Sequence, residues 1–327
     1  MACFKPRAAF RPPDGGPLAF HHRKNYTLMT IRCGNCIGCM IDDSRDWAAR
    51  CMHEAKLHTH NCFLTLTFND EHLPNSYSLD HRYFQLFIKK LREAALQGEV
   101  WGPSHENANA ILHSRHGGSL HTSGQTERAI IRYHMCGEYG PLNGRQHYHA
   151  NMFGINFADR KRWKTTPAGY VIYKSETLDK IWGNGYASIG QLTWQTAAYT
   201  ARYNMKKAGE KNKKWEILNP DTGEIILREP EYQKMSRNPG IGKDWIKQFK
   251  TDVYPRGTIL VNGAEVTTPR FYDDYYRTID EDAYQRLKSH RQHEQGQRPV
   301  ELTKNRIIAE ETVTRAKLAF LKRQGQF

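Results

Sequence analysis

The chain has 327 residues, and 48 lysines and arginines against 34 aspartates and glutamates give it a net charge of +14. This surplus of positive charge favours an anionic partner such as nucleic acid. No stretch approaches the roughly 18 consecutive apolar residues of a membrane-spanning helix. The N-terminal segment has no apolar run of signal-peptide length, so we expect neither membrane insertion nor secretion.

Helices and strands alternate along the first two thirds of the chain. The segment at 62–68 alternates residue by residue and is rich in β-forming side chains, which is typical of a strand. In chain order we predict irregular structure over 1–39, a helix over 41–58, a strand over 62–68, a helix near 80–96, a loop over 102–127, strands over 129–135, 148–155, 170–173 and 186–189, and a helix over 193–207.

The pattern becomes less regular after about residue 208. Turn signals predict β-hairpins over 215–229 and 258–266, and a charged helical tail begins at Glu281. We therefore divide the chain into a cysteine-rich N-terminal segment (1–39), a core (40–208) and a C-terminal region with hairpins and a helical tail (209–327).

Two histidines at the start of a predicted strand form the strongest candidate metal site. His147 and His149 are two residues apart, so a strand points both side chains to the same face. Glu138 lies on the far side of a turn-rich segment and reaches the same ion if the two segments pair as a hairpin. Two histidines and one carboxylate leave coordination positions open for catalysis. The alternative is a histidine pair without a metal.

A tyrosine pair is the candidate nucleophile. Tyr199 and Tyr203 are four residues apart on a predicted helix and therefore share a face, with Arg202, Lys206 and Lys207 close by. Neighbouring cations favour a phenolate. The alternative is an aromatic stripe in the core.

Together, the metal site, the tyrosines and the positive charge predict phosphodiester chemistry on DNA. A tyrosine that attacks phosphorus forms a 5′-phosphotyrosine bond and releases a 3′-hydroxyl group. Because the bond energy is retained, a strand end can later reverse the step and rejoin the DNA. A second tyrosine on the same face can carry out a second transfer.

The chain resembles the replication initiation proteins of gokushovirus-type single-stranded DNA bacteriophages, the Microviridae, which belong to the HUH endonuclease group. The resemblance covers nearly the whole chain. It depends on CGNCIGC (33–39), WAARCMHE (47–54), FLTLTFN (63–69), CGEYG (136–140), GRQHYH (144–149), AYTARY (198–203) and MSRNPGIG (235–242).

The resemblance implies an α+β fold with an antiparallel sheet flanked by helices, and rolling-circle replication in the cytoplasm of a bacterial host. The protein would nick the viral strand of the duplex replicative form at the origin, remain attached to the 5′ end, and release circular single-stranded DNA. It implies that His147 and His149 hold Mg²⁺ or Mn²⁺ and that Tyr199 and Tyr203 are the nucleophiles. Arg202 stands where relatives often carry lysine, which keeps the charge and alters the donor geometry.

The N-terminal cysteines suggest a second metal site. Cys33, Cys36 and Cys39 form a C-x₂-C-x₂-C pattern, and Cys3 is the best fourth ligand for a structural zinc, with Cys51 and His53 as rivals. Reduced thiols without a metal and an iron–sulfur cluster are the alternatives.

Clusters of basic residues are candidate contacts to DNA phosphates. Lys89, Lys90 and Arg92 lie on one face of the predicted helix near 80–96, and a second cluster occupies 160–164. The alternative is a solvated basic face. The segment 235–242 is expected to be a loop in which Gly240 and Gly242 allow tight turning.

Two other functions fit parts of the pattern. One is a transposase or relaxase with the same HUH chemistry, and the other is a zinc-stabilised DNA-binding protein without catalysis. The sequence has no phosphate-binding G-x₄-G-K-[ST] loop, so we expect unwinding to depend on a host helicase and synthesis on a host polymerase.

Overall fold

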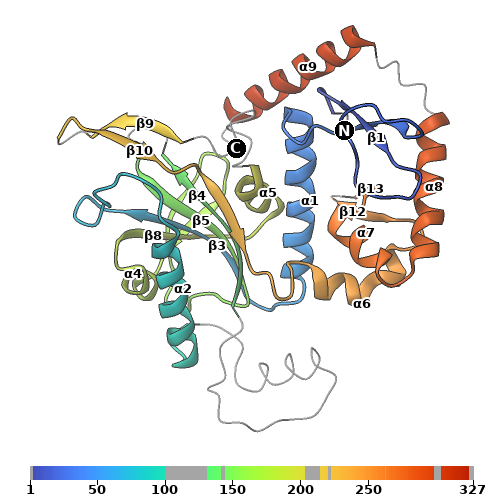
Figure 1. Ribbon diagram of the computed structural model, residues 1–327. Coiled ribbons are helices and arrows are strands. Elements are labelled where there is room, and N and C mark those ends of the chain that lie inside the picture. The colour runs from blue at the N-terminus through green and yellow to red at the C-terminus, as the bar shows by residue number, and fades with distance from the viewer. Residues whose placement is uncertain are drawn as a thin grey trace.

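A seven-stranded antiparallel sheet organises the molecule and confirms the α+β class (Figure 1). The computed structural model describes residues 3–100, 131–140, 144–202, 214–219, 222–261, 263–297 and 303–323. The predicted loop over 102–127 lies outside these residues, as do Tyr203, Lys206 and Lys207.

The sheet has the strand order β11-β4-β5-β3-β8-β7-β6. Its strands are β3 (Asn61–Phe68), β4 (Arg132–Tyr139), β5 (Gln146–Phe153), β6 (Lys161–Thr165), β7 (Val171–Lys174), β8 (Gly185–Gly190) and β11 (Tyr232–Met235). Three further pairs form two-stranded sheets: β1 (Arg7–Arg11) with β2 (Thr27–Ile31), β9 (Trp215–Leu218) with β10 (Ile225–Arg228), and β12 (Thr258–Val261) with β13 (Ala264–Thr267).

Strict alternation along the central strand β3 separates the two faces of the sheet. Leu64, Leu66 and Phe68 are fully buried on one face, where they pack with α2 (His81–Leu96) and α4 (Glu176–Trp182). Both helices begin at a side-chain cap, because Asp80 and Ser175 accept hydrogen bonds from backbone N–H groups in the first turn.

The opposite face carries polar residues and is covered by α5 (Trp194–Arg202), with α1 (Ile37–Ala55) packed against α5. Alanines at the contact allow close approach: Ala48 of α1 and Ala197 and Ala198 of α5 belong to one buried cluster. Figure 1 shows α2 and α4 on one side of the sheet and α5 and α1 on the other.

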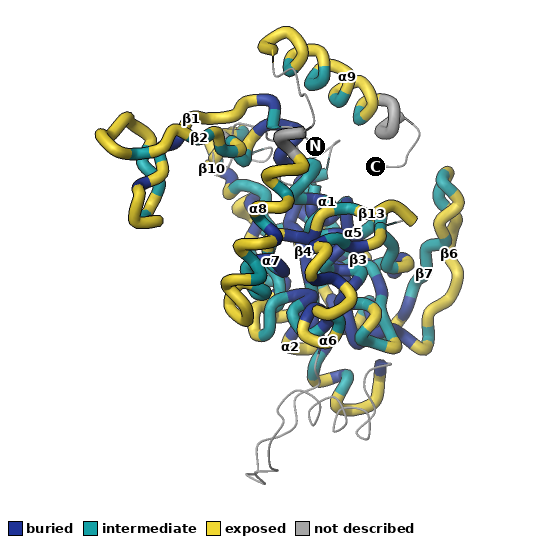
Figure 2. Tube along the Cα trace, turned by 90° about the vertical axis from the view of Figure 1, so that its right-hand side faces the viewer, coloured by how far each residue is buried: buried dark blue, intermediate teal, exposed yellow. Residues whose placement is uncertain are grey.

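A second core joins the C-terminal elements to α1. It is built from α6 (Lys243–Val253), α7 (Arg270–Arg277) and α8 (Glu281–Gln297), with Trp245, Tyr272 and Leu287 buried next to Ala49. The last described helix, α9 (Lys304–Arg323), lies against α1 and is largely exposed (Figure 2). No described helix has both the length and the apolar composition needed to cross a bilayer.

The loop at 235–242 is held by buried charges. Glu54 of α1 forms an ion pair with Arg132 and accepts the backbone N–H of Gly242 at 2.8 Å, and Arg132 also donates to the carbonyl of Pro239 at 2.8 Å. Gly242 has φ +77°, so its backbone conformation favours glycine.

Several boundaries differ from the sequence prediction. The first long helix begins at Ile37 rather than at residue 41, and the paired strands occupy 132–139 and 146–153 rather than 129–135 and 148–155. The hairpin β1–β2, the short helix α4 and the strands β6 and β11 were not predicted. Strand β6 is exposed along its whole length, so it lacks the apolar alternation that reveals a half-buried strand.

Candidate metal and tyrosine site

The antiparallel pairing of β4 with β5 decides which side chains meet on the polar face. Glu138 lies directly opposite His147, and Cys136 lies opposite His149. Each of Glu138, His147 and His149 offers a ligand atom, and the three atoms lie within 4.8 Å of one another. The structure therefore brings together the three residues that the sequence proposed as a metal site.

Both imidazoles present Nε2 to the carboxylate. His149 Nε2 lies 2.8 Å from Glu138 Oε1, and His147 Nε2 is also in contact with this oxygen. On the other side of the rings, His147 Nδ1 donates to the carbonyl of Arg145 at 3.0 Å, and His149 Nδ1 lies 3.0 Å from the hydroxyl of Thr65. Such outer contacts fix the ring orientation that a metal ligand needs.

Tyr199 joins the site from helix α5. Its hydroxyl donates to Glu138 Oε1 at 3.0 Å and lies 3.3 Å from Oε2, and its ring packs edge-on against the His149 ring with centroids 5.0 Å apart. Tyr203 lies outside the described residues, so only one member of the predicted tyrosine pair is placed.

The charges at the site are strongly coupled. Burial raises the pKa of the Glu138 carboxyl, but hydrogen bonds from His147 and His149 outweigh burial and lower that pKa to about 2. Burial and the adjacent Glu138 charge raise the pKa of the Tyr199 phenol. Glu138 is thus a carboxylate at neutral pH, while Tyr199 keeps its proton in this arrangement.

Strand β3 supplies two site residues that the sequence did not single out. Thr65 faces His149 across the β3–β5 ladder, and the ring of Phe63 stacks on the His149 ring with centroids 5.5 Å apart. The alternation along β3 already places both residues on one face. The register between β3 and β5, which brings this face to His149, comes from the fold.

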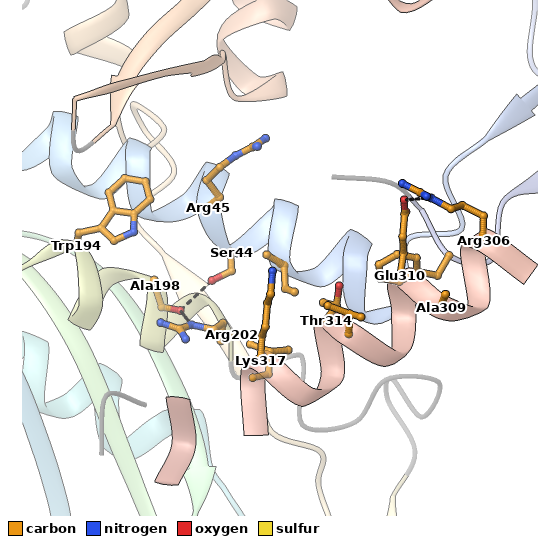
Figure 3. Close-up of a pocket in the computed structure, with 14 residues that line it drawn as sticks. Ser44, Arg45, Trp194, Ala198, Arg202, Arg306, Ala309, Glu310, Thr314 and Lys317 are labelled. Atoms are coloured by element: carbon orange, nitrogen blue, oxygen red, sulfur yellow. Dashed lines mark hydrogen bonds and ion pairs between the residues drawn. The ribbon is translucent and has the colours of Figure 1, made fainter. Parts of the chain in front are cut away.

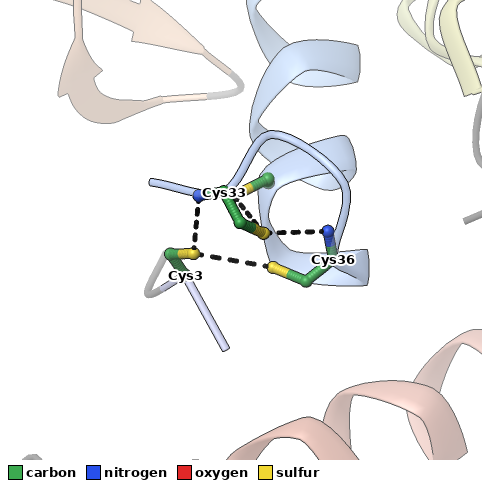
Figure 4. Close-up of side chains that lie close together, drawn as sticks. Cys3, Cys33 and Cys36 are labelled. Carbon is green, nitrogen blue, oxygen red and sulfur yellow. Dashed lines mark hydrogen bonds between the residues drawn. The ribbon is translucent and has the colours of Figure 1, made fainter. Parts of the chain in front are cut away.

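The N-terminal cysteines form a second cluster (Figure 4). The Sγ atoms of Cys3, Cys33, Cys36 and Cys39 lie within 4.8 Å of one another. Backbone N–H groups donate to three of these sulfurs: Cys33 to Cys3 Sγ at 3.2 Å, Cys36 to Cys33 Sγ at 3.2 Å, and Phe4 to Cys36 Sγ at 3.3 Å. Such donors stabilise thiolates, so the donor chemistry fits a tetrahedral zinc.

The rival ligands for this cluster lie elsewhere. Cys51 is buried under the sheet with its Sγ 3.5 Å from His134 Nδ1. His53 stacks on Trp245 with ring centroids 3.6 Å apart, and its Nδ1 lies 3.0 Å from the hydroxyl of Tyr272.

The candidate DNA contacts occupy three separate places. Arg202 is on α5, one turn beyond Tyr199, whereas Lys89, Lys90 and Arg92 are on α2, across the sheet from Glu138. The basic cluster at 160–164 includes most of edge strand β6 and is exposed throughout.

Comparison with known proteins gives consistent matches. A family model for replication-associated proteins of the ORF2 type matches residues 61–208, which contain β3 to α5. The chain is 30% identical to the replication-associated protein VP4 of Bdellovibrio phage phiMH2K over 88% of this chain and 83% of the relative. It is 28% identical to the replication-associated protein ORF2 of Spiroplasma virus 4 over 84% and 79% of the two chains.

A third relative, the replication-associated protein ORF4 of Chlamydia phage 1, is 24% identical over 80% of this chain and 56% of its own length. No solved structure matches the chain.

Proposed function

The chain belongs to the replication-associated proteins of Microviridae phages, and from this membership we propose that it is a metal-dependent DNA nickase and strand transferase that starts rolling-circle replication. The family inferred from the sequence motifs is confirmed. The proposed activity includes nicking the viral strand at the origin, a 5′-phosphotyrosine link, and rejoining to release circular single-stranded DNA, all in the cytoplasm of the bacterial host.

One observation carries this proposal: Tyr199 contacts the carboxylate that both histidines also contact. A nucleophile and a candidate metal site on one buried face are what tyrosine-mediated cleavage requires. An HUH-type active site is therefore the arrangement we propose for β4, β5 and α5.

The three ligands fit a divalent ion. One carboxylate and two neutral imidazoles carry a net charge of −1 and leave coordination positions open. Mg²⁺ or Mn²⁺ held by Glu138, His147 and His149 would withdraw charge from a phosphodiester and offset the Glu138 carboxylate.

The remaining chemistry belongs to the protein. The Tyr199 hydroxyl oxygen attacks phosphorus, the bond from phosphorus to the 3′ oxygen breaks, and a 5′-phosphotyrosine ester forms. The proton that Tyr199 loses is balanced by the proton that the leaving 3′ oxygen gains. The contact to Glu138 holds the phenol oxygen in place, and Thr65 holds His149. Tyr203 is proposed as the nucleophile of the second transfer.

A covalent adduct tests the proposal. The protein is incubated with single-stranded origin DNA and Mg²⁺ or Mn²⁺, and the products are separated under denaturing conditions. We expect a protein–DNA adduct that is lost with EDTA and in the Tyr199→Phe/Tyr203→Phe double variant. A shifted native complex without any adduct would instead support the non-catalytic DNA-binding protein, and insertion of the cleaved end into unrelated DNA would support a transposase.

We also propose that Cys3, Cys33, Cys36 and Cys39 hold a structural zinc. The four-sulfur donor set and the N–H groups that point to it support this assignment. The zinc would fix the N-terminal end of α1. Lys89, Lys90, Arg92, Arg202, Lys206 and Lys207 are proposed to contact DNA, while a host helicase and polymerase supply unwinding and synthesis.

A further inference from the structure

A pocket of about 790 Å³ opens between α1, α5 and α9, outside the candidate metal site (Figure 3). Its lining combines apolar side chains with four cations, Arg45, Arg202, Arg306 and Lys317. Trp194, at the start of α5, adds an aromatic ring to the wall.

The walls of this pocket are anchored to the rest of the fold. Ser44 of α1 donates to the carbonyl of Ala198 on α5 at 3.0 Å, which ties these two helices together. Ile307 and Leu318 of α9 pack against Phe4 and Ile37, in the apolar cluster that also contains the cysteines. The pocket is therefore framed by packed elements.

The four cations differ in how far acids neutralise them. Arg45 lies 3.7 Å from Asp42 and 3.3 Å from Asp46, and Arg306 lies 3.2 Å from Glu310. Among the described residues, no acid lies within ion-pair distance of Lys317.

Arg202 completes the positive lining. Its Nε donates to the Ala198 carbonyl at 3.2 Å. Burial lowers the pKa of Arg202 to about 10, which leaves it charged at neutral pH. Figure 3 shows Lys317 extending from α9 toward α1, so the cations come from three different helices.

The pocket and the candidate metal site share helix α5. Ala198 lines the pocket, while the next residue, Tyr199, reaches Glu138 over the sheet. An α-helix with its side chains is only about 10 Å wide, so an extended strand bound in the pocket passes close to the candidate nucleophile.

We propose that this pocket binds a short stretch of single-stranded DNA, with a base against Trp194 and phosphates at Arg202 and Lys317. Cations along a groove with an aromatic platform are the usual means of holding single strands without reading sequence. The inference takes from the proposed function only that the chain handles single-stranded DNA.

Removal of one cation tests the pocket against a matched control. Lys317→Ala removes a charge from the pocket, and Lys304→Ala removes the same charge from the start of α9, outside the pocket lining. Fluorescence anisotropy with a labelled oligothymidine measures the affinity at several salt concentrations. We expect Lys317→Ala to raise Kd several-fold and to reduce the slope of log affinity against log salt by about 0.7. Lys304→Ala should change neither.

Cross-linking of the unaltered protein gives a second measurement that does not depend on any variant folding. Oligothymidine carrying 4-thiothymidine is irradiated with the protein, and the linked peptides are identified by mass spectrometry. We expect links to peptides that contain Trp194 or the pocket face of α9. Links only to other regions, with equal binding by both lysine variants, would overturn the pocket.

The two proposals fail in different ways. If no adduct forms but Lys317→Ala still weakens binding relative to Lys304→Ala, nicking is wrong and the pocket stands. If the adduct forms while the two lysine variants bind alike and no cross-link reaches the pocket, nicking stands and the pocket is wrong.

Discussion

The hydroxyl of Tyr199 lies within hydrogen-bonding distance of both oxygens of the Glu138 carboxylate, at 3.0 Å and 3.3 Å. The same carboxylate also contacts Nε2 of both histidines. One buried acid thus joins strand β4, strand β5 and helix α5, and any ion bound there lies next to the phenol. This contact makes Tyr199 the expected nucleophile of the first cleavage.

We expect the first DNA adduct to form on Tyr199. Tyr199→Phe should lower the rate of first cleavage by about 10³-fold or more, because the ring keeps its packing but loses the attacking oxygen. Tyr203→Phe should retain first cleavage and lose the second transfer. Peptide mapping of the adduct by mass spectrometry identifies the linked residue. An adduct on Tyr203 that persists in Tyr199→Phe would reverse the assignment.

Thr65 is expected to act by holding the His149 ring. Thr65→Val removes the hydroxyl next to Nδ1 and should weaken Mn²⁺ binding by about 10- to 100-fold. Thr67→Val is the matched control, because Thr67 lies on the same face of β3 and no described contact joins its hydroxyl to the histidines. Isothermal titration with Mn²⁺ measures both variants, and equal affinities would show that Thr65 does not position the ligand.

Much of the site geometry could be predicted because strand periodicity is short and strict. The two-residue spacing of His147 and His149 fixes their common face whatever else the fold does. Glu138 depended on a hairpin, and the observed pairing of Glu138 with His147 supplies that condition. The roles of these residues remain predictions.

Long-range register could not be read from the sequence. Nothing local indicates that Thr65 lies opposite His149, or that β11, far along the chain, pairs with β4 at the edge of the sheet. The contact between Cys3 and the later cysteines was proposed from composition alone, and the folding of the N-terminal segment brings it about. These contacts depend on tertiary packing, which outweighs local preference.

The cysteine cluster should hold about one zinc ion per chain, since four thiolates fill a tetrahedral site. Elemental analysis of anaerobically purified protein measures the metal. Cys36→Ser should lose the zinc and make the N-terminal segment sensitive to protease, whereas Cys62→Ala, in the core of the sheet, should keep it. Iron in place of zinc, or no metal at all, would contradict the assignment.

Gly242 should tolerate no side chain. Its φ of +77° is costly for other residues, and a Cβ there would lie 2.5 Å from the Tyr272 hydroxyl. We expect Gly242→Ala to lower the free energy of unfolding by more than the roughly 1–2 kcal/mol that the backbone conformation alone costs. Gly223→Ala is the control, because Gly223 has φ +73° but nothing within 4 Å of the added Cβ. Urea denaturation compares the two, and equal losses would mean that the clash is relieved.

Buried histidines should make the fold sensitive to mild acid. Burial lowers the pKa of His53 to about 3 and that of His134 to about 4, against 6.5 for the exposed ring. Below pH 6.5 the unfolded chain therefore binds more protons than the folded one. Stability is complete above this pH and is lost as the pH falls toward the folded pKa, at up to about 1.4 kcal/mol per pH unit for each histidine.

His53→Gln tests this sign. Glutamine can still bond to the Tyr272 hydroxyl but does not titrate, so the decline in unfolding free energy between about pH 6.5 and pH 5 should become shallower by close to one proton's contribution. His290→Gln removes an exposed histidine on α8 and should leave the slope unchanged. The free energies come from urea denaturation at each pH. An unchanged slope in His53→Gln would mean that His53 titrates in the folded protein as it does in the unfolded chain.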